Sequence, residues 1–308
     1  MIENVKIYHD GSHYIGVVPG LGCPRSGKKA PTSATVQVLE DCEDGSKHFY
    51  KITHKELFER TYRASQSFSR KERKRYTFTQ MRAHFKSDSD TNLFIQNQVA
   101  RKMKNLAARR KRLVRKVFMT GFDYFCTFTY DSNKHSEATF KKRLQRKFKD
   151  LVYRNGWRYL GVWERSPDEK RLHFHGLFNI PPGELPGVLF EVEDWSVKKH
   201  RMQKTLQNSY FNEHFGRSDF RPIENDVHLR ESINYLLKYI EKTGERIVYS
   251  HGLPEFFVSD IKSEDVVTHL YNVTDKRLIL CDDFDCIIEG EEIGKVCEEV
   301  IEQMPKIL

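Results

Sequence analysis

Arg171-Leu172-His173-Phe174-His175-Gly176-Leu177-Phe178 is the stretch that decides the fold of the central part of the chain. Its apolar residues predict a β-strand, whose side chains alternate between two faces. His173 and His175 therefore share one face, while Leu172 and Phe174 point to the other. Two neighbouring imidazoles on a sheet are suitable ligands for a divalent metal ion.

A second strand, residues 157–165, precedes this one and is joined to it by a short loop at 166–170. Glu164 shares a face with Leu160 and Val162 and lies near the turn, opposite the start of the histidine strand. It is the candidate third ligand, and two imidazoles with one carboxylate suit Mg²⁺ or Mn²⁺. A surface ion pair with a neighbouring Arg or Lys is the alternative for Glu164.

Residues 227–242 predict a helix with two distinct sides. Its apolar stripe consists of Ile233, Leu236, Leu237 and Ile240. The opposite side carries Tyr235, Lys238, Tyr239 and Lys242. Packing is the ordinary role of such tyrosines, but here the apolar stripe is already complete without them. A tyrosine beside a metal and a lysine can attack a phosphodiester, leaving a 5′-phosphotyrosine that a second tyrosine can reverse.

The remaining periodicities predict an α+β fold with a central antiparallel sheet. Strands are expected at 122–130, 157–165, 171–179 and 218–223, and helices at 140–152, about 195–210 and 227–242. This order is a split β-α-β (ferredoxin-like or RRM-like) core with its helices on one face of the sheet. Before it, short strands are expected at 5–19 and 35–52, and helices over 54–117. We predict a basic N-terminal region (1–115), a catalytic domain (116–245) and an acidic C-terminal extension (246–308) of unknown role.

The net charge of +9 favours an anionic partner. Residues 101–116 hold nine Lys and Arg and no acidic residue, as expected of a nucleic-acid contact or of a solvated basic helix. The predicted phosphate contacts are Arg109, Arg110, Lys111, Arg112 and Arg115, with Lys242 on the tyrosine helix. The segment 22–29 is similar to a phosphate-binding loop, but Lys29 replaces its Ser/Thr and no helix follows.

Two features favour an intracellular, cytoplasmic protein without a membrane partner. The sequence shows no apolar run long enough to span a bilayer and no secretory leader pattern. The six cysteines are scattered and form no C-x-x-C pair.

Three motifs in this order resemble the HUH endonuclease superfamily, and within it the rolling-circle replication initiators of the two-tyrosine type. They are Phe125 to Tyr130, the pair His173 and His175, and the run from Tyr235 to Lys242. The resemblance covers about residues 118–245. It implies catalytic Tyr235 and Tyr239 with an assisting Lys238, and a metal held by Glu164, His173 and His175. It also implies single-stranded DNA at an origin hairpin or nick site as substrate, and a host helicase and polymerase as partners.

Other classes of protein share parts of this pattern. A transposase or a relaxase would use the same chemistry, although relaxases often place the tyrosine before the histidines. A non-catalytic nucleic-acid-binding module would share the sheet, but its open face would show stacking aromatics rather than His173 and His175. A zinc hydrolase motif fails because Leu177 stands where an aspartate is needed.

Overall fold

The computed structural model describes residues 1–19, 35–41, 47–165, 171–196, 200–242, 246–271 and 276–305. Within these ranges, only the backbone is described at 39–41, 47–49, 196, 240–242, 270–271 and 276. The phosphate-loop-like segment 22–29, the loop 166–170 and the side chain of Lys242 lie outside the described residues. The chain divides into two compact units, one formed by Met1–Leu21 with Arg109–Leu308 and one by Gly22–Ala108.

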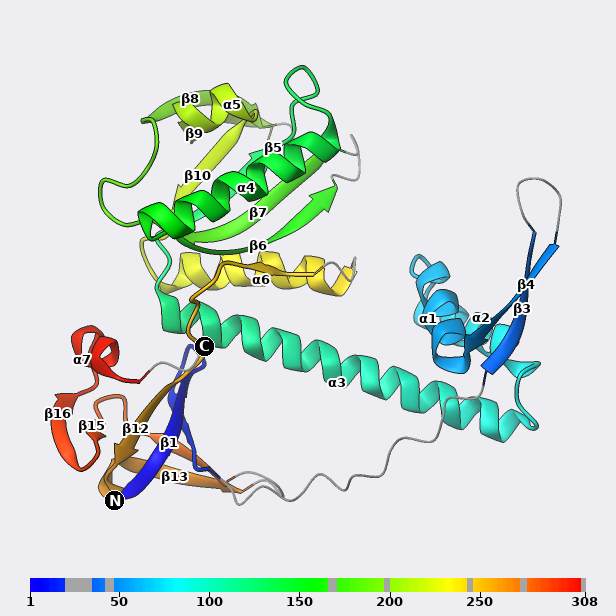
Figure 1. The fold of residues 1–308 in the computed structure, drawn as a ribbon, viewed down its shortest axis with the longest axis horizontal. Helices are drawn as coiled ribbons and strands as arrows, with labels where there is room; N and C mark the ends of the chain where they lie inside the picture. The colour runs from blue at the N-terminus through cyan, green and yellow to red at the C-terminus, as the bar shows by residue number, and fades with distance from the viewer. Residues whose placement is uncertain are drawn as a thin grey trace. The chain divides into compact units, whose positions relative to one another are not determined.

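A five-stranded antiparallel sheet forms the centre of the larger unit (Figure 1). Its strands, in spatial order, are β10 (Ser218–Pro222), β5 (Tyr124–Thr129), β7 (Leu172–Asn179), β6 (Arg158–Arg165) and β11 (Val248–Tyr249). Because β7 runs antiparallel to both of its neighbours, β5 and β6 are parallel to each other across it. The α+β class and the four principal predicted strands are confirmed.

Helix α4 (Glu137–Asn155) connects β5 to β6 and covers one face of this sheet. Ser136 caps its start, and Gly156 ends it in the left-handed conformation at φ 69°. Phe148 of α4 contacts Phe174 and Phe178 of β7, with ring centroids 5.3 and 5.2 Å apart. Burial of each such side chain stabilises the fold by about 1.5–3 kcal/mol. This face is therefore the hydrophobic core of the domain.

Helix α6 (Asp226–Lys242) lies on the opposite face of the sheet, where the ring of its Tyr235 contacts His175. The expectation that the helices share one face is therefore wrong. The physical reason is the alternation within β7, because Phe174 and His175 point to opposite sides and each side receives its own helix. The apolar stripe of α6 is buried at Leu229, Ile233 and Leu236.

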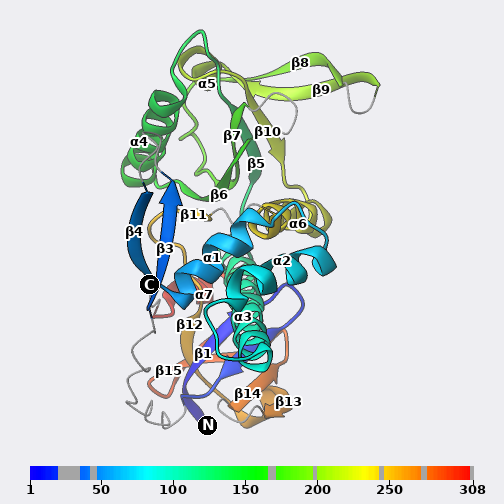
Figure 2. The same cartoon turned by 90° about the vertical axis from the view of Figure 1, so that its right-hand side faces the viewer.

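The predicted helix at 195–210 is also wrong. Strands β8 (Leu189–Ser196) and β9 (Arg201–Asn208) form an antiparallel hairpin there, followed by the short helix α5 (Ser209–His214). Many residues of β9 have good helix propensity, but pairing with β8 along its whole length overrides that weak preference. The hairpin extends away from the sheet beside β10 (Figure 2).

A seven-stranded antiparallel sheet joins the two ends of the described chain. The N-terminal strand β1 (Ile2–His9) pairs with β2 (Tyr14–Val17) on one side and with β12 (Phe257–Ile261) on the other. The sheet is completed by β13 (Val266–Tyr271), β14 (Lys276–Leu280), β15 (Asp285–Ile288) and β16 (Glu291–Lys295). A 3-10 turn, η1 (Ser263–Asp265), and helix α7 (Glu298–Gln303) accompany them. The acidic extension and the first residues of the basic region thus share one core, a grouping that the predicted region boundaries do not follow.

The smaller unit contains the hairpin of β3 (Thr35–Asp41) and β4 (Lys47–Thr53) and the helices α1 (His54–Ala64) and α2 (Arg70–Arg82). Helix α3 (Asp88–Thr120) begins in this unit, and its residues from Arg109 onward belong to the larger one. Capping boxes at Thr53 and Ser69 start α1 and α2. The helices predicted over 54–117 are confirmed.

Candidate active site

Three strands place polar side chains on the sheet face that α6 covers. His173 and His175 come from β7, and Glu164 from β6 lies directly opposite His173. Thr127 and Thr129 of β5 lie opposite His175 and His173 on the other side. Each of these residues has the parity that points away from the α4 core, so period-two alternation alone gathers the group.

Hydrogen bonds hold both imidazoles. The Nδ1 of His175 is 3.0 Å from the hydroxyl oxygen of Thr127, and the Nδ1 of His173 is 3.1 Å from that of Thr129. The Nε2 of His175 lies 2.8 Å from a carboxylate oxygen of Glu164. The side chains of His175 and Glu164 are only 8% and 11% exposed, so this contact is shielded from water.

Helix α6 brings two tyrosine rings to the same place. The ring centroid of His175 lies 5.1 Å from that of Tyr235 and 5.9 Å from that of Tyr239, which stacks on it. The two tyrosine rings are 5.0 Å apart because one helical turn separates them. Phe125 of β5 completes the aromatic surroundings at 5.5 Å from Tyr235. The strands and the tyrosine helix thus form one site.

The carboxyl of Glu164 is held in its charged form. Burial alone would raise its pKa, but hydrogen bonds from His175 and Tyr239, and the charges of the two histidines, lower the pKa below its usual value. A carboxylate that stays ionised can accept hydrogen bonds or bind a cation.

The two tyrosines differ in their environment. Burial, together with hydrogen bonds to Tyr235 and Glu164, raises the pKa of Tyr239 far above its usual value. Burial also raises the pKa of Tyr235, but its hydrogen bond with Tyr239 opposes this effect. Tyr235 is 36% exposed, so it is the more accessible of the two hydroxyls.

The predicted ligands form a suitable donor set for a divalent metal, although the described residues include no cluster of three His, Cys, Asp or Glu side chains close enough to hold one. The fit rests on the threonines. A ligating imidazole needs a hydrogen-bond partner at its other nitrogen, and Thr127 and Thr129 occupy that position. A threonine hydroxyl can donate or accept, so it serves the imidazole with or without a metal on Nε2. The metal and its ligands stay a prediction.

The predicted cations lie elsewhere. Lys238 is exposed on α6. The side chains at 109–112 are exposed on α3, and the Nε of Arg112 is 3.8 Å from Glu255. The guanidinium of Arg115 stacks on the ring of Tyr8 at 3.7 Å, so it is already engaged within the fold. Their predicted contacts with DNA are not tested by these positions.

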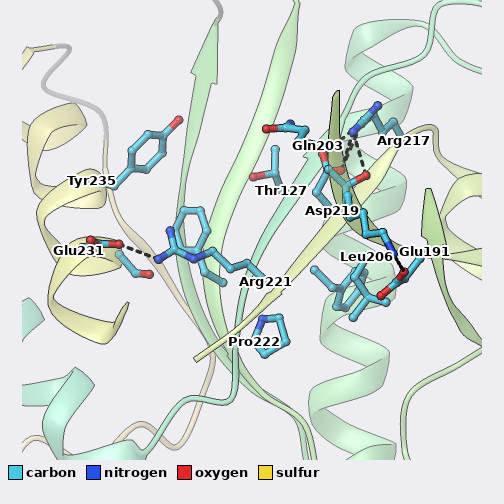
Figure 3. Close-up of a pocket in the computed structure, with 15 residues that line it drawn as sticks. Thr127, Glu191, Gln203, Leu206, Arg217, Asp219, Arg221, Pro222, Glu231 and Tyr235 are labelled. Carbon is cyan, nitrogen blue, oxygen red and sulfur yellow. Dashed lines mark hydrogen bonds and ion pairs between the residues drawn. The ribbon is translucent and has the colours of Figure 1, made fainter. Parts of the chain in front are cut away.

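A pocket of about 780 Å³ adjoins this site (Figure 3). It is lined by residues of β5, β9, β10 and α6, and Thr127 and Tyr235 belong to both the pocket and the site. The lining residues from β9 were missed from the sequence because a helix was predicted there. Alternation of apolar and polar residues at 189–195 was the available signal. The threonines were missed because no role was assigned to them within the motif at 125–130.

Residues 123–244 match the model of a protein family described as replication-associated protein ORF2. The matched region contains the central sheet, both histidines and both tyrosines. No curated protein and no solved structure gave a significant match to the chain. The family match supports a role in DNA replication, in a family of rolling-circle initiators, and this coarser part of the predicted resemblance is confirmed. No described helix is long and apolar enough to cross a membrane.

Proposed function

We propose that this chain is a metal-dependent single-stranded DNA endonuclease and strand transferase that nicks a replication origin and so starts rolling-circle replication of a plasmid, phage or other mobile element. The observation that carries the proposal is the contact of the His175 ring with both Tyr235 and Tyr239. Structural ion pairing alone would not require two tyrosines on a face that already holds paired histidines. The family match at 123–244 supports the replication role.

The reaction exchanges one phosphodiester for another. The hydroxyl oxygen of Tyr235 forms a bond to phosphorus, the bond from phosphorus to the 3′-oxygen breaks, and the tyrosine proton passes to solvent or to a neighbouring base. The products are a 5′-phosphotyrosine and a free 3′-hydroxyl. Mg²⁺ or Mn²⁺, held by His173, His175 and Glu164, would polarise the phosphate. Lys238 would steady the developing charge.

Tyr235 is the better candidate for the first attack. It is the more exposed tyrosine and faces the pocket, whereas the hydroxyl of Tyr239 is engaged by Glu164. Tyr239 would act in the second transfer, after its hydroxyl is released from the carboxylate. Because the first transfer conserves the number of ester bonds, it is reversible and permits this alternation.

The strand order of β10, β5, β7 and β6, with α4 connecting the two parallel strands, supports the proposed HUH-type split β-α-β core. In this proposal the substrate is single-stranded DNA at an origin hairpin or nick site, positioned by phosphate contacts of the 1–115 region. A host helicase and polymerase would extend the free 3′-end in the cytoplasm.

The test is formation of a covalent adduct. Purified protein is incubated with Mn²⁺ and labelled single-stranded oligonucleotides from its own genetic locus, and the products are separated on denaturing gels. We expect a protein–DNA band that requires metal and is lost in His173→Ala and Tyr235→Phe. Tyr153→Phe is the matched control, because Tyr153 is 91% exposed on α4, away from the site. Tight binding without any adduct would favour a binding module instead, and an adduct lost only in Tyr239→Phe would exchange the two tyrosine roles.

A further inference from the structure

The pocket beside Tyr235 is an extension of the proposed active site toward β10 and the hairpin of β8 and β9 (Figure 3). Thr127 marks the connection, since its hydroxyl contacts His175 at 3.0 Å and its side chain also lines the pocket. A strand with a phosphate at Tyr235 must therefore place an adjoining nucleotide at the pocket. Its volume of about 780 Å³ is in the range typical of ligand sites, roughly 300–1,000 Å³.

The cations that line the pocket are already paired with acids. Arg217 is held by Asp194 at 2.6 Å and by Asp219 at 2.9 Å. Each of the other two cations has one acidic partner: Arg221 with Glu231 at 2.6 Å, and Lys204 with Glu191 at 3.1 Å. Three cations thus face at least as many carboxylates, on a chain whose net charge is +9. A phosphate site would show an excess of cations, so the pocket is suited to an uncharged part of the nucleotide.

Gln203 supplies an unused hydrogen-bonding group. It lies on β9 and lines the pocket beside Thr127, and it makes no hydrogen bond with any other described residue. Its amide carries donors and an acceptor side by side, which is the pattern that reads the edge of a nucleobase. The guanidinium of Arg217, fixed at its edges by two carboxylates, leaves a planar face on which a base can stack.

We propose that this pocket binds a nucleobase next to the scissile phosphate and that Gln203 reads it. The inference rests on the proposed function for the identity of the strand, but it adds a source of sequence preference outside the catalytic residues. It predicts that the base preference at one position beside the nick depends on the hairpin of β8 and β9.

The experiment uses the full chain and a pool of single-stranded DNA with randomised sequence. In the first arm, covalent adducts formed with Mn²⁺ are isolated and the DNA is sequenced around the nick. In the second arm, DNA is selected by binding alone, without metal. Wild-type protein is compared with Gln203→Ala and with the control Gln96→Ala, which removes an exposed glutamine of the smaller unit.

We expect wild-type protein and Gln96→Ala to favour one base at a position beside the nick, and Gln203→Ala to lose most of that preference, roughly 5- to 150-fold for a well-made pair of hydrogen bonds. If adducts form and Gln203→Ala keeps the wild-type profile, the pocket inference is overturned while the nuclease stands. If no adduct forms but the binding arm shows a Gln203-dependent preference, the nuclease fails and the pocket inference stands. Absence of a Gln203-dependent preference in both arms overturns it.

Discussion

Gly161 of β6 lies opposite Gly176 of β7, directly behind the histidine pair. A Cβ atom at Gly161 would lie 2.4 Å from the carbonyl oxygen of His175 and 2.5 Å from Cζ of Phe174. Both distances are shorter than real side chains allow, and one obstacle is the backbone of a central strand bonded on both sides. We therefore expect Gly161→Ala to lower the free energy of unfolding by about 1–3 kcal/mol, the usual cost of overpacking.

The assay is urea unfolding followed by tryptophan fluorescence. Trp157 and Trp163 report on the right region, because they are 1% and 5% exposed and belong to the same core as Phe174. Gly176→Ala provides a graded comparison, since its Cβ would lie 2.8 Å from the carbonyl of Leu160. The added methyl at Gly176 meets looser contacts, so this variant should lose less stability than Gly161→Ala.

A double-mutant cycle with Phe174→Leu separates the two clashes. Leucine lacks the ring atoms that obstruct the methyl group, so Gly161→Ala should cost less in the Phe174→Leu background than in the wild type. The carbonyl clash remains, so the rescue should be partial. An unfolding free energy that Gly161→Ala leaves unchanged, or strict additivity in the cycle, would refute the steric reasoning.

Three further predictions concern the site and the surface. Thr127→Val removes the hydroxyl at His175 Nδ1 and should weaken Mn²⁺ affinity or nicking about 10- to 100-fold, measured by titration and adduct yield, while Thr79→Val leaves both unchanged. Replacing residues 109–112 by glutamine should reduce the salt dependence of single-stranded DNA binding by a slope of up to about 3, whereas an unchanged slope would exclude them. Lys262 lowers the pKa of Asp285, so that pair stabilises the fold above about pH 4 and is lost as pH falls further; acid unfolding of Asp285→Asn should lack this component.

The site was largely predictable because its signals are local. The alternation of His173, Phe174 and His175 needs only the geometry of one strand, and the spacing of Tyr235 and Tyr239 needs only one helical turn. Which face of the sheet α6 would cover was not predicted. That choice depends on Phe174 and Phe178 filling the α4 side, which is a property of the assembled sheet.

The parts that failed depend on pairing between distant or weakly patterned segments. Residues 201–208 contain Met, Gln, Lys and Leu, all good helix formers, and only the partner strand at 189–196 makes them extended. The pairing of β1 with β12 joins residues about 250 positions apart, and no local pattern reports such a partner.

The placement of β1 between β2 and β12 has a consequence during synthesis on the ribosome. Val5 and Ile7 are among the first residues made, yet they are fully buried only when residues near 257–261 have been translated. Until then one edge of β1 has no partner, and an open strand edge of this kind invites pairing with other chains. We expect ribosome-bound chains arrested near residue 250 to be bound by a chaperone at this strand and released once about 40 more residues have emerged. Selective cross-linking at position 6 would measure this, and equal cross-linking at both lengths would contradict it.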